Sequence, residues 1–149
     1  MAVFRLTKAF SFEMAHALVG YDGPCSAIHG HSYRLFVTVK GAPEGDEQSP
    51  KQGMVIDFGV LKQIVNEEVV NRLDHALVLS KKCDEQLREA LKERYRNLVE
   101  VEYQPTSENL LEEFARRIIS RLPQGVMLYS LRLHETATSY AEWFADDNP

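Results

Sequence analysis

Alternating apolar and polar positions predict strands near both ends of the chain. The clearest strand covers residues 31–40, and aromatic and β-branched residues predict another over residues 3–12. One face of the clearer strand carries Tyr33, Leu35, Val37 and Val39. Residues 126–133 and 138–144 predict two strands near the C-terminus, and residues 98–103 predict a short one.

Helical periodicity marks the middle of the chain. Asp57 suits an N-cap, and Thr106 or Ser107 suits the cap of a second helix that opens at Pro105. The apolar stripes of these two helices are Leu61, Ile64, Val65, Val69 and Leu73, and Leu110, Leu111, Phe114, Ile118 and Leu122. Residues 81–96 are highly charged and predict a short exposed helix. The order of these elements predicts one α+β domain over residues 1–149, an antiparallel sheet with helices on one face.

Composition narrows the class of protein. The chain has 17 Lys and Arg against 22 Asp and Glu, a formal net charge of -5, which argues against a general nucleic-acid binder. A small anionic ligand needs only a local positive pocket and stays compatible with this balance. No apolar run approaches the roughly 20 residues of a membrane span, and the N-terminus lacks the pattern of a signal peptide. Two cysteines exclude a disulfide-rich scaffold. We expect a soluble cytoplasmic protein with reduced thiols.

Three of the five histidines could meet at the loop between the first two strands. In extended backbone, His29 and His31 of His29-Gly-His31 point the same way, so both imidazoles can reach one ion. His16 follows the first predicted strand and would face them if the two strands pair. Three neutral imidazoles with an open fourth position suit a catalytic zinc ion. A chance His-x-His with a surface His16 is the alternative.

The two cysteines differ in their surroundings. Cys25 lies four residues before His29, so a metal there would favour its thiolate. Cys25 could then serve as a fourth zinc ligand or as a proton-transfer group beside an open metal. Cys83 lies in the charged segment without an evident partner, and we interpret it as an inert thiol.

Two further motifs carry acidic groups. Asp74-His75 follows the first long helix, and a carboxylate that holds an imidazole is a common proton-transfer unit. Adjacent residues on a regular helix do not face each other, so the pair requires the helix to end there; otherwise it is a surface pair. Glu135 follows an apolar strand and could accept hydrogen bonds from an amidine-like edge of a guanine or pterin, or could be a solvated acid.

Together these motifs resemble the 6-pyruvoyl-tetrahydropterin synthase/QueD family. The matching segments occur in family order and span most of the chain. They are Phe12-Glu-Met-Ala-His16, Cys25-x-x-x-His29-Gly-His31-Ser-Tyr33, Gly53-Met-Val-Ile-Asp57-Phe, Leu73-Asp-His75, Pro105-Thr-Ser-Glu-Asn109 and His134-Glu-Thr136. The resemblance implies the tunnelling fold, a ββααββ subunit with a four-stranded antiparallel sheet. It also implies that three subunits close a barrel, that two trimers form a homohexamer, and that active sites lie between subunits.

The resemblance also implies roles for single residues. The three histidines of the cluster, His16, His29 and His31, match the zinc ligands. Cys25 matches the catalytic cysteine, and Asp74 and His75 match a catalytic acid–histidine pair given by a neighbouring subunit. Glu135 matches the glutamate that anchors the pterin ring, and Thr106 matches a residue that lines the pterin pocket.

Two branches of this family use 7,8-dihydroneopterin triphosphate. One eliminates triphosphate to give 6-pyruvoyl-tetrahydropterin. The other, QueD, serves queuosine and 7-deazapurine biosynthesis and gives 6-carboxy-5,6,7,8-tetrahydropterin, acetaldehyde and triphosphate. The three-residue spacing between Cys25 and His29, and Ser32 after the His-Gly-His motif, resemble QueD. A pterin-binding module without turnover and a metal-free thiol hydrolase are the alternatives from other classes.

Overall fold

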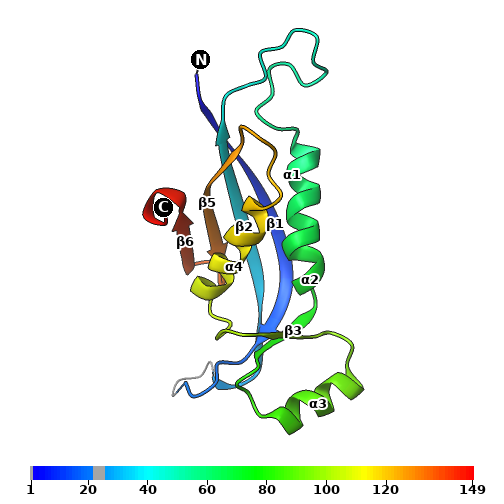
Figure 1. Cartoon of the computed structure of the whole chain (residues 1–149). Helices are drawn as coiled ribbons and strands as arrows, with labels where there is room; N and C mark the ends of the chain where they lie inside the picture. The colour runs from blue at the N-terminus through cyan, green and yellow to red at the C-terminus, as the bar shows by residue number, and fades with distance from the viewer. Residues whose placement is uncertain (1, 22–25) are drawn as a thin grey trace.

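The computed structural model describes residues 2–21 and 26–149. Six strands form one sheet in the order β4-β3-β1-β2-β5-β6 (Figure 1). The strands are β1 Phe4–His16, β2 His29–Gly41, β3 Ala76–Ser80, β4 Leu98–Val101, β5 Met127–His134 and β6 Tyr140–Phe144. The two long strands β1 and β2 pair along their whole length and form the centre of the sheet.

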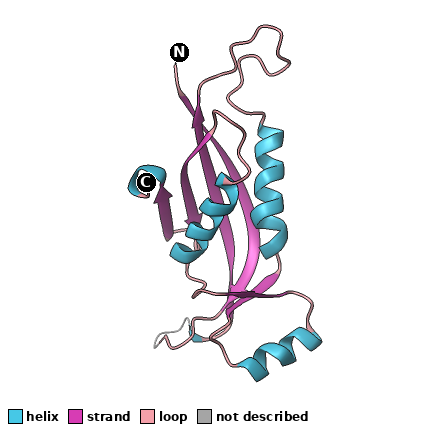
Figure 2. Cartoon of the chain, viewed as in Figure 1, coloured by secondary structure: helices cyan, strands magenta, loops and turns pink. Residues whose placement is uncertain are grey.

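Helices cover one face of this sheet. Helix α1 (Phe58–Val65) continues through a π-helical turn (Asn66–Val70) into α2 (Asn71–Leu73), and α4 (Ser107–Ile119) lies beside it (Figure 2). Helix α3 (Glu85–Arg94) stands apart at the end of the sheet, and a 3-10 turn over Ala145–Asp147 follows β6. Within the described ranges, none of these helices has the length and apolar character needed to cross a membrane.

The predicted four-stranded antiparallel sheet is wrong in two respects. The sheet has six strands, and β3 pairs in parallel with both β1 and β4. The run Ala76–Ser80 is short and lacks a polar alternation, so its apolar residues cannot be separated by pattern from the preceding helix. The remaining pairs, β1 with β2, β2 with β5 and β5 with β6, are antiparallel as expected.

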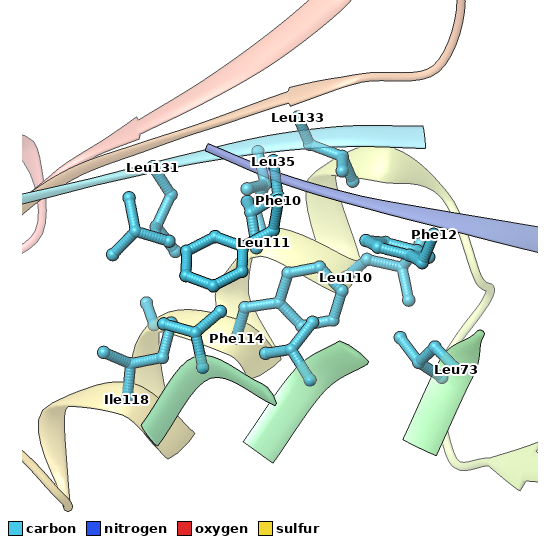
Figure 3. Packing of buried hydrophobic residues seen from close by; sticks show 14 of the residues in the cluster. Phe10, Phe12, Leu35, Leu73, Leu110, Leu111, Phe114, Ile118, Leu131 and Leu133 are labelled. Atoms are coloured by element: carbon cyan, nitrogen blue, oxygen red, sulfur yellow. The ribbon is translucent and has the colours of Figure 1, made fainter. Parts of the chain in front are cut away.

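The hydrophobic core lies between the sheet and the helices. Figure 3 shows side chains of β1, β2 and β5 packed against those of α4. The rings of Phe12 and Tyr33 stack with centroids 5.2 Å apart, and Phe114 of α4 meets Phe12 edge-on at 6.3 Å. Full burial of one large apolar side chain contributes about 1.5–3 kcal/mol to stability. This packing anchors β1 just before its end at His16 and β2 just after its start at His29.

Both predicted helix caps are present. The side chain of Asp57 accepts the backbone N–H of Gly59 at 2.7 Å, and Thr106 Oγ1 accepts that of Asn109 at 3.3 Å. Each cap satisfies one of the backbone donors that an α-helix leaves without an internal partner. The cap at Thr106 fixes the start of α4 next to the end of β1, where the candidate site lies.

Candidate metal centre and adjacent cavity

Three histidines meet where β1 ends and β2 begins. Strand pairing sets His16 directly opposite His29. His31 lies two residues further along β2, so its side chain is on the same face. Ring centroids are 4.7 Å apart for His16 and His29 and 4.8 Å apart for His29 and His31. One ligand atom from each residue lies within 4.8 Å of the others. The predicted cluster of the three side chains is therefore present.

Backbone carbonyl groups orient two of these rings. Nδ1 of His16 is 2.7 Å from the carbonyl oxygen of Pro105, and Nδ1 of His29 is 2.7 Å from that of Ala27. Because a carbonyl oxygen only accepts hydrogen bonds, each Nδ1 donates, and Nε2 carries no proton when the ring is neutral. These two Nε2 atoms are 3.1 Å apart. Two lone pairs at that distance repel each other unless a cation compensates them.

His31 adds a third nitrogen to this group. Its Nε2 is buried and has no hydrogen-bond partner among the described residues, a costly state for a polar atom. Burial is the main cause that lowers the pKa of His16, and charge on His29 and His31 would lower it further. A lowered pKa keeps the ring of His16 neutral, as a metal ligand must be. The donor set fits a divalent metal ion of the kind that imidazoles hold.

The carboxylate of Glu135 borders the histidine cluster. Glu135 follows β5, and its backbone N–H donates to the carbonyl oxygen of Ser139 at 3.1 Å in the connection to β6. Its Oε1 lies 3.4 Å from Nε2 of His31 and 3.5 Å from Nε2 of His16. Both distances are longer than a typical N–H···O hydrogen bond, and Nε2 of a neutral His16 ring has no proton to donate to the carboxylate. Glu135 belongs to the cluster and is not an isolated surface acid.

A cavity of about 240 Å³ opens beside the cluster. Its lining includes His16, Thr106, Ser107, Glu135 and Tyr140. Ser107 was not among the predicted site residues, yet its Oγ is buried and has no hydrogen-bond partner within the described ranges. The signal for it was available in the sequence, because Ser107 follows Thr106 in the Pro-Thr-Ser-Glu-Asn motif. The cavity is thus lined by several hydroxyl-bearing side chains and by carboxylates that suit a polar ligand.

Asp74 and His75 form a carboxylate–imidazole pair. The helix ends at Leu73, Asp74 has extended backbone, and His75 has a φ of 63°. This turn brings Oδ1 of Asp74 within 3.1 Å of Nδ1 of His75, which neighbours on a continuous helix could not achieve. The pKa of Asp74 is lowered, first by the backbone N–H of Glu13 and then by His75. The pair required the helix to end at this point, and the helix does end there.

His75 of this pair borders a different cavity from Glu135. His75 is 79% exposed and lines a second cavity of about 460 Å³ together with His31. His16 lines the cavity that contains Glu135. The histidine cluster therefore borders both cavities, and the structure of one chain does not bring His75 and Glu135 into a single one.

The structure describes only one of the two cysteines. Cys25, the predicted proton-transfer residue, lies outside the described residues. Cys83 is a half-buried free thiol between β3 and α3. Its interpretation as an inert thiol stays a prediction.

Comparison with known proteins identifies the family. The family model described as 6-pyruvoyl tetrahydropterin synthase matches residues 5–146, nearly the whole chain. The chain belongs to this family. The resemblance drawn from the six short motifs is therefore confirmed.

Two bacterial relatives cover almost all of the chain. The 6-carboxy-5,6,7,8-tetrahydropterin synthase of Haemophilus influenzae is 36% identical over 145 residues, which are 95% of this chain and 99% of the relative. The protein of the same name from Synechocystis is 34% identical over 140 residues, 93% of this chain and 91% of the relative.

Two solved structures share the fold. An uncharacterized protein from Wolinella succinogenes superposes with a TM-score of 0.74 at 21% identity, covering 97% of this chain and 99% of its own. The 6-pyruvoyl tetrahydropterin synthase of Plasmodium vivax gives a TM-score of 0.71 at 19% identity, covering 96% and 98%. The tunnelling fold expected from the sequence is confirmed.

Proposed function

We propose that this protein is a zinc-dependent 6-carboxy-5,6,7,8-tetrahydropterin synthase. It converts 7,8-dihydroneopterin triphosphate and one water molecule to 6-carboxy-5,6,7,8-tetrahydropterin, acetaldehyde and triphosphate, a step of queuosine and 7-deazapurine biosynthesis. Two relatives with that printed name, matched over almost the whole chain, support the reaction. The observation that carries the proposal is the group of three converging ring nitrogens beside a carboxylate-lined cavity.

Nε2 atoms of His16, His29 and His31 would hold the zinc ion. When bound, zinc supplies a Lewis acid that polarises oxygen atoms of the substrate side chain. The carbonyl groups of Pro105 and Ala27 support this role, because each accepts the N–H on the far side of a ligand ring and keeps that ring in place. The chain thereby presents ligand nitrogens without having to reorganise.

The cavity beside the cluster would take the pterin ring. Glu135 would accept paired hydrogen bonds from the amidine-like edge of the ring, and Thr106 and Ser107 would offer hydroxyl groups to it. Binding at these groups would orient the reacting side chain toward the histidines, and such orientation is a large part of enzymatic rate enhancement.

Proton transfer would fall to Cys25 and His75, with Asp74 orienting His75 through the 3.1 Å contact. Because His75 and Glu135 border different cavities within one chain, we propose that the Asp74–His75 pair serves the site of a neighbouring subunit. A closed trimer within a homohexamer would bring these groups together. The outer strands of the described sheet, β4 and β6, each leave one edge available for that assembly.

Mass spectrometry of the products tests the proposal. The purified zinc-loaded protein is incubated with 7,8-dihydroneopterin triphosphate, and a His31→Ala variant serves as the control without a complete histidine cluster. Formation of 6-carboxy-5,6,7,8-tetrahydropterin with acetaldehyde is the expected result. A 6-pyruvoyl product alone would reassign the protein to the other branch, and substrate that is bound but unchanged would indicate a binding module.

A further inference from the structure

The turn that presents His75 is an unusual point of the backbone. Its φ of 63° lies in the left-handed region, and no other non-glycine residue in the described ranges has a positive φ. Side chains with a Cβ atom rarely adopt this conformation, because it brings that atom close to the backbone. Neighbouring groups must therefore hold the turn.

Strand β1 holds one side of this turn. The backbone N–H of His75 donates to the carbonyl oxygen of Glu13 at 2.6 Å, and the N–H of Glu13 donates to Oδ1 of Asp74 at 2.9 Å. These two bonds fix Asp74 and the start of His75 against a central strand of the sheet. The carbonyl group of His75, on the other side of the turn, is held by a different residue.

That residue is Asn97. Its Nδ2 donates to the carbonyl oxygen of His75 at 2.6 Å, and its own backbone carbonyl accepts the N–H of Leu77 at 3.0 Å. Because a carbonyl oxygen cannot donate, the amide nitrogen of Asn97 must be the atom that faces His75. Asn97 also lines the cavity of about 460 Å³ that contains His75 and His31.

The charged segment between β3 and β4 places Asn97 at this position. Asn97 directly precedes β4 and follows α3, a helix with no buried side chain. Glu100 of β4 pairs with Arg88 of α3 at 3.1 Å and with Lys92 of α3 at 2.6 Å. Since the side chain of Glu100 is only 12% exposed, solvent screens these pairs less than surface pairs. Ion pairs thus hold α3 against β4, and strand pairing holds β4 against β3. This arrangement places Asn97, just before β4, beside the turn at His75.

We propose that Asn97 is a positioning residue for His75: its side-chain amide holds the left-handed turn that aims the imidazole. This inference rests on the proposed function, in which His75 transfers a proton. The property that matters is the ability of the side chain at position 97 to donate a hydrogen bond. A side chain that cannot donate leaves the carbonyl oxygen of His75 without this partner or sets a second acceptor against it. The turn then relaxes and the imidazole shifts. A displacement of about 1 Å in a reacting group can lower a rate by about 10²-fold.

Two substitutions separate donation from the filling of space. Asn97→Asp keeps the size of the side chain but sets a charged acceptor opposite the carbonyl of His75, whereas Asn97→Ala leaves that carbonyl to water. Asn148→Asp is the matched control, since Asn148 Nδ2 also donates to a backbone carbonyl, that of Phe144, at 2.8 Å. This control introduces the same charge beside β6, at the opposite edge of the sheet from β4.

Steady-state kinetics with 7,8-dihydroneopterin triphosphate is the first measurement. We expect Asn97→Asp to lower kcat by about 10²-fold, and Asn97→Ala to lower it less, with KM and zinc content unchanged in both. Asn148→Asp should match the wild type. A residue that only fills space would give the reverse order, with Ala worse than Asp. That order, or an unchanged kcat in Asn97→Asp, would overturn the proposal.

The second measurement is nuclear magnetic resonance of histidine-labelled, zinc-loaded protein without substrate. The signals of His75 are assigned by their absence in His75→Ala. Both substitutions at Asn97 should move these signals and leave those of His16, His29 and His31 in place. Unmoved His75 signals would refute the positioning role. If the wild type does not turn over the substrate, the proposed function fails, and these spectra alone decide whether Asn97 positions His75.

Discussion

His16 and His29 face each other across the β1–β2 pair with their Nε2 atoms 3.1 Å apart, while Nδ1 of each ring donates to a backbone carbonyl. One of these carbonyls belongs to Pro105, directly before the cap of α4, so the start of that helix and the end of β1 are bound to each other through an imidazole. With both rings neutral, the arrangement sets two lone pairs in repulsion. A metal ion would convert this repulsion into attraction, which links metal binding to the stability of this end of the sheet.

Removal of one histidine should therefore remove the metal. We expect His31→Ala to lose zinc and activity and to keep the fold, because the core beneath the cluster does not depend on its ring. Zinc is measured by elemental analysis and the fold by circular dichroism. His75→Ala is the matched control, since it also removes an imidazole but should retain zinc while losing turnover. Full zinc stoichiometry in His31→Ala would refute the ligand assignment.

Glu135 contacts the histidines and also lines the adjacent cavity, so its role needs its own test. We expect Glu135→Gln to keep zinc and to raise KM, because a neutral amide cannot accept the paired hydrogen bonds of the pterin edge. Loss of hydrogen bonds to a charged group costs about 1.5–3 kcal/mol, roughly a 10- to 150-fold change in KM. Zinc content and KM are measured on the same preparation. Loss of zinc with an unchanged KM would make Glu135 a metal ligand instead.

Local patterns predicted most of the elements, but not strand β3 and its two parallel pairings. The caps at Asp57 and Thr106 and the strands around Tyr33 follow from short-range rules, and the structure contains them. Strand β3 was missed because it is stabilised by parallel pairing with β4 and with β1, and β1 lies far away in sequence. The π-helical turn over Asn66–Val70 was missed because its apolar spacing fits an ordinary helix.

In the candidate site too, some features follow from local patterns and others depend on long-range contacts. The clustering of His16 with His29 and His31 followed from strand alternation and one antiparallel pairing. The contribution of Asn97 could not be predicted, because it depends on β3 and on the backbone angle of His75. The spacing of Cys25 from His29 left two roles open, the resemblance to the family favoured proton transfer, and Cys25 lies outside the described residues.

Cys25 should act in proton transfer and not in metal binding. Three imidazoles already supply the ligands of an open catalytic site, and a thiolate would close it. We expect Cys25→Ala to keep zinc and bind the pterin, with turnover lower by about 10²–10⁴-fold. Cys83→Ala, which removes the chain's other thiol, should change little. Loss of zinc from Cys25→Ala would place the thiolate on the metal, and unchanged turnover would rule out the proposed mechanism.

Asp74 should make stability depend on pH in acid. The N–H of Glu13 and the neighbouring His75 lower the pKa of Asp74 in the folded protein, so the folded state favours its charged form. Its stabilising contribution is therefore complete above the ordinary aspartate pKa of about 3.9 and is lost as the pH falls through the lower pKa of the folded state. Urea unfolding of the wild type and Asp74→Asn should show a stability difference that is constant near neutral pH and disappears in acid. A difference that grows in acid would contradict this assignment.

Assembly should be required for activity, because the proposed site takes Asp74 and His75 from one subunit and Glu135 from another. We expect analytical ultracentrifugation at micromolar concentration to show a trimer or hexamer and no 17.0 kDa species. Mixing His75→Ala with Glu135→Ala under conditions that exchange subunits should restore part of the activity at a substrate concentration far below the raised KM of Glu135→Ala, since some mixed interfaces contain both intact groups. A mixture of two variants at Glu135 is the matched control and should recover no activity. An active monomer, or failure of the mixture to recover despite demonstrated exchange, would show that each chain carries a complete site.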